Sequence, residues 1–151
     1  MTEMPEGNAV VYCEGAFASA NGKTAHGLIR FTRRYRVLSV VDSRHRGKDA
    51  GALLDGKPIG TPVVGSLTEA LENASDRGLP ATHLVVGLAP DGGRLPAEAR
   101  ADLAAAMETG LNVDSGLHDF LSEDPELAAV ADRAGVVIRD VRTPPDRKRL
   151  H

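Results

Sequence analysis

A lysine near the start of the chain closes a loop of small residues. The loop opens at Gly15 after the apolar run 9–13 and ends in Gly22-Lys23-Thr24, where we expect a helix to begin. Backbone N–H groups at a helix N-terminus lack intrahelical partners and carry the positive end of the helix dipole. Together with a lysine ammonium they are suited to hold a phosphate or a carboxylate. The sequence therefore predicts an anion site at Gly15 and Gly22-Lys23-Thr24, the alternative being a tight strand-to-helix turn with a surface lysine.

Neither common phosphate-binding motif is complete in this loop. Gly15 and Gly22 are its only glycines and lie seven residues apart, so the loop is not the G-x-G-x-x-G of dinucleotide-binding domains. Phe17 stands where a Walker A motif has its first glycine. Because the backbone needs that glycine to wrap a phosphate, we do not expect ATP hydrolysis here, whereas simple anion binding remains open.

An acidic residue and a basic cluster follow the second apolar run. Asp42 lies about 20 residues beyond the small-residue loop, where the acid of a Rossmann domain binds a ribose hydroxyl. Ser43, Arg44 and Arg46 come directly after it. Positive charge at this position favours a phosphate on the ribose, as in NADP or in the 3′-phosphate of coenzyme A, over NAD. The alternative is a solvated loop after an ordinary strand-end aspartate.

One histidine is a candidate catalytic general base. His118 follows an expected strand and is close in sequence to Asp114, Ser115 and Asp119. A histidine beside carboxylates can accept a proton near neutral pH. The alternative is a turn histidine that is held by hydrogen bonds. The other histidines show no ligand spacing and a single cysteine cannot build a zinc site, so we expect no metal.

Alternating strands and helices must position these residues. The expected strands are residues 9–13, 36–41, 61–65, 82–88, 111–114 and 136–141. The expected helices are residues 24–32, a helix with a Ser66/Glu69 capping box that Gly78 stops, residues 96–109, and a helix from Pro125 that ends at Gly135. Residues 43–60 are expected to form a long loop. Pro62 favours an edge position for strand 61–65.

This order of elements predicts an α/β domain, a Rossmann-like three-layer sandwich with a mainly parallel sheet of five to six strands. Right-handed crossovers place the strand-to-helix loops on one edge, where such sheets bind ligands. Convergence of the loops at 14–23, 42–48, 89–93 and 115–118 adds five candidate ligand-binding residues, Pro90, Gly92, Gly93, Ser115 and Gly116. The expected division of the chain is an N-terminal tail 1–8, the domain 9–142 and a C-terminal linker 143–151.

Composition narrows the classes of function. The 151 residues carry a formal net charge of −3, 3% are aromatic and none is Trp, so we expect no nucleic-acid partner. No apolar run approaches the length of a membrane span, and no secretory signal opens the sequence. The single cysteine fits a reducing compartment. We therefore expect a cytoplasmic domain that binds a small molecule.

Five short strings together resemble a known family. They are Glu14-Gly-Ala-Phe17, Lys23-Thr-Ala-His-Gly-Leu-Ile-Arg30, Val41-Asp-Ser43, Gly60-Thr-Pro-Val63 and Ser115-Gly-Leu-His-Asp-Phe-Leu121. The family pairs an N-terminal Rossmann-like domain with a C-terminal P-loop domain and includes D-glutamate N-acetyltransferases. The resemblance covers nearly all of residues 8–151. It implies the cofactor or substrate half of an enzyme that acylates an amino acid, with acetyl-CoA or another phosphate-bearing nucleotide as ligand and a P-loop domain, in the same or another chain, as partner.

The resemblance leaves other functions open. The family passes into its P-loop domain about where this sequence ends, so we expect that half to be absent and this chain not to be catalytic alone. One alternative is a non-catalytic assembly domain that forms a homo-oligomer through an exposed sheet edge or its helices. Another is a stand-alone coenzyme A- or NADP-binding protein, such as an oxidoreductase. The chain also resembles, more weakly, the coenzyme A-binding domain of succinyl-CoA synthetase.

Overall fold

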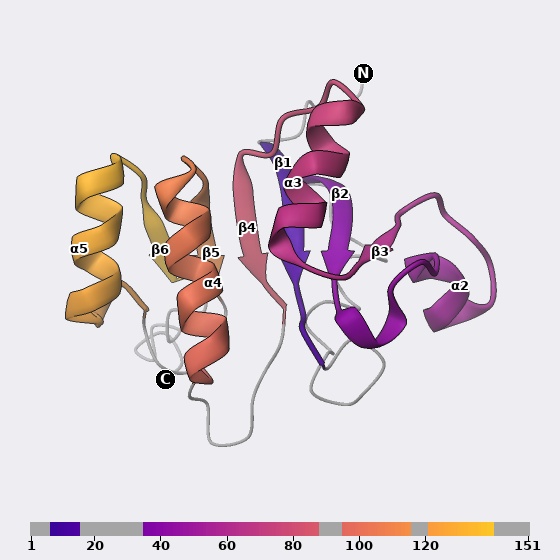
Figure 1. Ribbon diagram of the computed structural model, residues 1–151, viewed down its shortest axis with the longest axis horizontal. Helices are drawn as coiled ribbons and strands as arrows, with labels where there is room; N and C mark the ends of the chain where they lie inside the picture. Colours follow the sequence, from indigo (N-terminus) through magenta and orange to yellow (C-terminus); the bar gives the residue numbers. More distant parts are fainter. Residues whose placement is uncertain (1–6, 16–34, 88–94, 116–120, 141–151) are drawn as a thin grey trace, which may run out of the picture.

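A single parallel sheet with helices against it makes up the computed structural model (Figure 1), which describes residues 7–15, 35–87, 95–115 and 121–140. The strands are β1 (Gly7–Tyr12), β2 (Tyr35–Val41), β3 (Val63–Val64), β4 (His83–Val86), β5 (Asn112–Ser115) and β6 (Ile138–Asp140). The helices are α2 (Ala50–Asp55), α3 (Leu67–Asp76), α4 (Ala97–Glu108) and α5 (Pro125–Ala134), with 3₁₀ turns η2 (Ser43–His45) and η4 (Leu121–Glu123).

The six strands lie in the order β3-β2-β1-β4-β5-β6, and every neighbouring pair is parallel. This is the strand order of a dinucleotide-binding Rossmann fold. The chain moves from β1 outward to β3, returns to β4 beside β1, and then moves outward in the other direction. The topological switch point therefore lies between β1 and β4, where Tyr12 is in register with Val86. The predicted Rossmann-like α/β fold with five to six strands is confirmed.

Burial explains why β1 is the central strand. Its residues Ala9–Tyr12 are all 0% exposed, as expected for an apolar strand of a parallel sheet that is covered on both faces. Side chains alternate between the two faces along a strand. Val10 joins the main core with the helix residues Leu103 and Met107, whereas Ala9 belongs to a second, smaller cluster with Tyr35 and Val85.

Three helices cover the same face of the sheet, as Figure 1 shows for α3, α4 and α5, while α2 lies at the β3 edge. The expected helix signals operate in α3, where Ser66 accepts a hydrogen bond from Glu69 N at 3.1 Å and Gly78 has a φ of +70° just past the C-terminus. In the expected capping box the Glu69 carboxylate would accept from the backbone of Ser66; it accepts instead from Gly65 N, at 2.7 Å. The Pro62 prediction is confirmed because β3 is an edge strand.

The expectation of a long loop at 43–60 is wrong. This stretch contains η2 and the six-residue helix α2. Asp49 caps α2 by accepting a hydrogen bond from Ala52 N, and it also accepts from the backbone N–H groups of Ile59 and Gly60 at 2.9 and 2.8 Å. Gly56 ends the helix with a φ of +75°. A helix this short has no apolar period, so only its two caps could have revealed it.

The remaining differences concern the ends of elements. β1 begins at Gly7, inside the expected tail, and β5 extends to Ser115, one residue further than expected. The expected helix 24–32, the loop 89–93 and the linker 143–151 lie outside the described residues. Within the described part of the chain, no helix is long and apolar enough to cross a membrane.

Candidate functional site

The carboxyl ends of β1, β2 and β4 meet beside the switch point. The sheet hydrogen bonding continues one residue past each strand: Cys13 N donates to Val41 O at 3.1 Å, and Gly87 N donates to Tyr12 O at 2.9 Å. The segments that leave these strands therefore start from fixed positions at one edge. In open α/β sheets ligands bind in the crevice at this edge.

Two carboxylates tie the segment after β1 to the segment after β2. Asp42 Oδ1 accepts hydrogen bonds from Gly15 N at 3.1 Å and from Arg44 N at 3.0 Å. In the opposite direction, the Glu14 carboxylate accepts from Ser43 N at 2.8 Å and from the Ser43 hydroxyl. We call this arrangement of Glu14, Gly15, Asp42 and Ser43 the double carboxylate bridge. It fixes the two segments relative to each other.

In the double carboxylate bridge, Asp42 stabilises the backbone after β1 and β2. Its side chain is fully buried, and Oδ1 also caps the 3₁₀ turn η2. Gly15 takes a φ of +75°, a left-handed conformation that favours glycine and that points its N–H at Asp42. Sequence reasoning placed Asp42 correctly at the end of β2 but missed Glu14, because its partner Ser43 lies 29 residues away. A ribose contact by Asp42 stays a prediction.

Arg44 is the exposed basic residue beside this bridge. Its Nε lies 3.9 Å from the position that a Cβ on Gly15 would occupy, so the side chain lies over the start of the segment after β1. Among the contacts of the described residues, its guanidinium has no hydrogen-bond or ion-pair partner. The Arg44 backbone is held by Asp42 while the charged end is available to a ligand.

Arg46 differs from Arg44, because it already has a carboxylate partner. Arg46 Nε lies 2.8 Å from Glu69 Oε1, and both residues line a hollow of about 470 Å³ at the ends of β2 and β3. The hydrogen bond to Arg46 is the main cause that lowers the pKa of Glu69. A Cβ on Gly65 would lie 2.7 Å from Arg46 Cδ, so glycine is needed for the guanidinium to lie there. Arg46 thus already has a carboxylate partner, and its binding of an anion stays a prediction.

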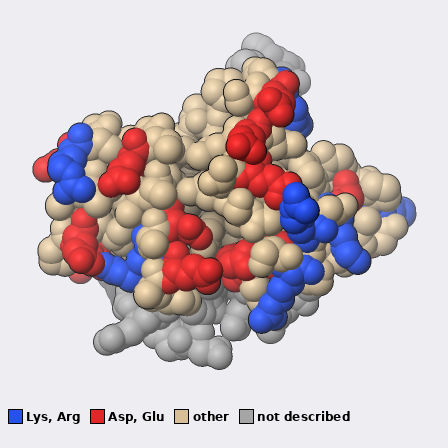
Figure 2. Space-filling model, viewed as in Figure 1, with Lys and Arg blue, Asp and Glu red and all other residues tan. Residues whose placement is uncertain are grey.

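The charges of the described surface are distributed unevenly (Figure 2). On the face shown there, a group of Lys and Arg side chains lies on the side of α2 and the segment between β2 and α2, others lie on the side of α5, and Asp and Glu side chains run over α3 and across the middle. The basic group on the side of α2 lies next to the β2 end of the carboxyl edge. This placement suits an anionic ligand that approaches from the β2 side.

Ser115 is buried at the end of β5, with its side chain 0% exposed. Its neighbour Asp114 is 3% exposed and pairs with Arg139 of β6, with Nη2 to Oδ2 at 2.8 Å. Arg139 Nη2 also donates a hydrogen bond to the hydroxyl of Tyr35, at 3.1 Å. Sequence reasoning did not predict this polar network; the available signal was a charged residue in each of two short strands that turn out to be neighbours. The Asp114–Arg139 pair belongs to the sheet face opposite α4.

The thiol of Cys13 and the phenol of Tyr12, at the end of β1, both have raised pKa values. Burial, followed by the negative charges of Asp42 and Glu14, raises the pKa of the Cys13 thiol to about 12, so it remains protonated. Burial likewise raises the pKa of Tyr12, whose hydroxyl donates to Asp102 Oδ2 at 2.6 Å. Neither residue is a nucleophile at neutral pH.

Several predicted site residues cannot be placed. The residues Gly22, Lys23, Thr24, Pro90, Gly92, Gly93, Gly116 and the candidate general base His118 lie outside the described residues. The residues that the structure does bring together at the edge are Gly15, Asp42, Ser43 and Arg44. The ranges that the structure describes contain no group of three or more His, Cys, Asp or Glu arranged to hold a metal ion.

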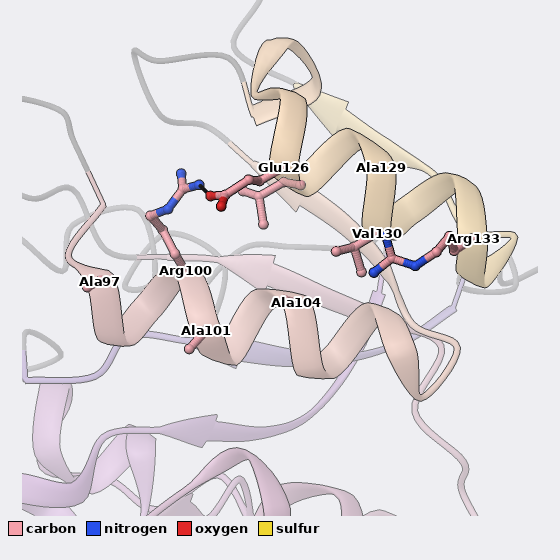
Figure 3. Close-up of a pocket in the computed structure, with 9 residues that line it drawn as sticks. Ala97, Arg100, Ala101, Ala104, Glu126, Ala129, Val130 and Arg133 are labelled. Carbon is pink, nitrogen blue, oxygen red and sulfur yellow. Dashed lines mark hydrogen bonds and ion pairs between the residues drawn. The ribbon is translucent and has the colours of Figure 1, made fainter.

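A separate apolar groove lies between α4 and α5 (Figure 3). It encloses about 510 Å³ and is lined by alanines of α4, among them Ala101 and Ala104, and by Val130 of α5. Arg100 crosses one end and pairs with Asp124 and with Glu126. The groove faces outward from the helix layer, away from the sheet.

Comparison with known proteins finds a matching family and a named relative. The model of the DUF1611_N family, described as a Rossmann-like domain of unknown function, matches residues 43–144. A D-glutamate N-acetyltransferase of Tritonibacter scottomollicae is 44% identical over 79 residues, which are 52% of this chain and 23% of that protein. The match therefore covers about a quarter of the length of that relative.

Solved structures agree with the fold. A DUF1611 family protein of Anabaena variabilis has a TM-score of 0.78 and 28% identity over 92% of this chain and 37% of that chain. A homoserine dehydrogenase of Thiobacillus denitrificans has a TM-score of 0.53 and 20% identity over 89% of this chain and 29% of that chain, which shows a shared fold alone. With its Rossmann strand order and a family match over most of its length, the chain belongs to the DUF1611_N family of Rossmann-like domains.

Proposed function

We propose that this chain is the ligand-binding Rossmann-like part of an enzyme of the D-glutamate N-acetyltransferase kind. Its ligand is a phosphate-bearing nucleotide, with acetyl-CoA as the acyl donor that such a reaction needs. The observation that carries the proposal is the Arg44 guanidinium, which is exposed at the carboxyl edge beside the switch point. The name of the Tritonibacter relative supports the choice of acyl donor.

The described residues fit such a ligand. A guanidinium presents a planar set of donors that match the oxygens of a phosphate. The double carboxylate bridge holds the Arg44 backbone, so the side chain starts from a fixed position. Lys23 and the N–H groups that follow it remain the predicted second phosphate contact. Transfer of the acyl group is proposed to need the P-loop domain that the family resemblance implies, in this or another chain.

Calorimetric titration of the purified chain tests the proposal. Acetyl-CoA, NADP, ATP and D-glutamate are titrated separately, and we expect heat from acetyl-CoA. Arg44→Ala should weaken binding about tenfold to a hundredfold, the effect of losing about 1.5–3 kcal/mol from a charge-assisted hydrogen bond. Arg36→Ala is the matched control, because Arg36 is also exposed but lies at the amino end of β2, whereas Arg44 follows the carboxyl end of that strand. Absence of heat from every nucleotide at millimolar concentration contradicts the proposal.

A second proposal, self-association, is supported by the outer face of α4. Ala97, Ala101 and Ala105 are exposed there, whereas a surface helix normally turns charged side chains to solvent. A second copy of the chain that packs on this face would cover these alanines and the groove beside α5. Light scattering on the wild type and on Ala101→Glu tests this, with a dimer expected only for the wild type. A monomeric wild type at high concentration contradicts it.

A further inference from the structure

We infer that the site selects nucleotides that carry a phosphate on their ribose and that Arg44 is the residue that determines this specificity. A ligand with a free ribose diol should bind weakly. The inference rests on the proposed function and goes further, since it names the part of the nucleotide that is recognised. It follows from which charged groups at the carboxyl edge already have partners.

Recognition of a ribose diol needs a carboxylate whose oxygens can accept hydrogen bonds from two hydroxyl groups. At the ends of β1 and β2 the structure describes two carboxylates. Asp42 is fully buried, and its Oδ1 accepts from the N–H groups of Gly15 and Arg44. Glu14 uses Oε1 for Ser43 N and Oε2 for the Ser43 hydroxyl. Both carboxylates therefore accept hydrogen bonds from protein groups at this edge. In an NAD site, a carboxylate at this position would instead accept from the ribose hydroxyls.

Of the two arginines at the same edge, one has a carboxylate partner and, among the described residues, the other does not. Arg46 is paired with Glu69 at 2.8 Å. Arg44 is exposed, and within the described part of the chain its guanidinium has no partner. A phosphate on the ribose brings two negative charges and several acceptor oxygens, which an arginine binds in a bidentate manner. The edge between β1 and β2 is therefore matched to a ribose phosphate and poorly matched to a diol.

The position of Arg44 agrees with this assignment. Arg44 is the third residue after β2, and the end of this strand is where dinucleotide-binding sheets meet the ribose nearest the adenine. The Arg44 N–H is fixed by Asp42, and its Nε stays near Gly15 at the start of the segment after β1. An arginine that is held at its backbone loses less conformational freedom when it binds a ligand.

Two pairs of ligands that differ by one phosphate test the inference. The wild-type chain is titrated with coenzyme A and 3′-dephospho-coenzyme A, and with NADP and NAD. In the wild type, we expect the ligand with the ribose phosphate to bind at least about tenfold more tightly than its partner that lacks this phosphate. In Arg44→Ala that ratio should fall to about one, whereas Arg36→Ala should keep it. Arg44→Lys should retain part of it, because the charge remains but the planar set of donors is lost.

The outcomes separate the inference from the proposed function. If coenzyme A and its dephosphorylated form bind equally well to the wild type, nucleotide binding stands and the inference is overturned. A preference that survives in Arg44→Ala overturns the assignment to Arg44. If no member of either pair binds, the proposed function fails. Thermal melting of Arg44→Ala, which changes an exposed side chain, shows whether the variant is folded before it is titrated.

Discussion

The Tyr12 hydroxyl donates a hydrogen bond to Asp102 Oδ2 at 2.6 Å and thereby joins the end of the central strand to α4. Tyr12 is fully buried next to the switch point, and Asp102 lies on the side of α4 that faces the sheet edge. The bond connects the two halves of the sheet, because β1 belongs to the first half and α4 to the second. It also gives the buried phenol the partner that it needs.

Tyr12→Phe should therefore lower the free energy of unfolding by about 1–2 kcal/mol, since the variant loses a hydrogen bond to a charged acceptor and keeps the ring. Urea unfolding measures the change. A double-mutant cycle with Asp102→Ala, which removes the acceptor, isolates the pair, and we expect the two changes to be less than additive. Strict additivity would mean that the hydroxyl and the carboxylate do not interact in solution.

Removal of the Asp42 carboxylate should have a larger effect on the carboxyl edge. Asp42→Ala leaves the N–H groups of Gly15 and Arg44 without their acceptor, and we expect a loss of about 2 kcal/mol in the free energy of unfolding. Asp42→Asn keeps an acceptor oxygen and should lose about half as much. Both are measured by urea unfolding. An equal loss in the two variants would show that the charge, rather than the hydrogen bonds, holds the two segments together.

The sheet was predictable because its central strands are mainly apolar runs. β1, β2 and β4 each bury residues on both faces, and such runs are visible without any knowledge of neighbours. Helices α3 and α5 were predictable because each begins at a capping residue and ends next to a glycine. Helix α2 was missed because six residues are too few for a period, and its only local signals were the cap Asp49, which accepts from Ala52 N, and Gly56 at its end.

The candidate site was predictable in place but not in detail. Topology brings Gly15, Asp42 and Arg44 to one edge, which the order of elements predicts. Which arginine is available depends on the pairing of Arg46 with Glu69, a contact across 23 residues. The bonds between Glu14 and Ser43 likewise depend on the register of β1 with β2. A single sequence specifies the edge at which such residues meet but not the partner that each one takes.

Acid should weaken the domain partly through Asp124. The hydrogen bond from Arg100 is the main cause that lowers the pKa of this carboxyl in the folded chain. A lowered folded pKa means that the stabilisation is present above the ordinary aspartate value of about 3.9 and is lost as the pH falls through the folded pKa. Arg100→Gln should therefore be less stable than the wild type by about 1 kcal/mol at neutral pH, with the difference shrinking below about pH 4.

Thermal melting of the wild type and Arg100→Gln from neutral pH down to about pH 2 checks this expectation. Comparison of the two chains removes the contributions of Asp49 and Glu69, whose pKa values are also lowered but by other contacts. A difference between the two chains that grows as the pH falls has the wrong sign for a carboxylate stabilised by arginine.

Ser39 and Ser66 differ in whether their hydroxyl groups have a hydrogen-bond partner. Ser39 on β2 is 0% exposed, and its Oγ has no hydrogen-bond partner in the described structure, so Ser39→Ala removes a buried polar group that was not satisfied. We expect the free energy of unfolding to rise by about 1 kcal/mol. Ser66→Ala should lower it by a similar amount, about 1 kcal/mol, because the Ser66 hydroxyl caps α3 by accepting from Glu69 N. Urea unfolding compares the two variants, which lose the same atom. A loss of stability in Ser39→Ala would show that this hydroxyl finds an acceptor in the folded chain, and the sign of the change therefore reports directly on the packing between β2 and its neighbours.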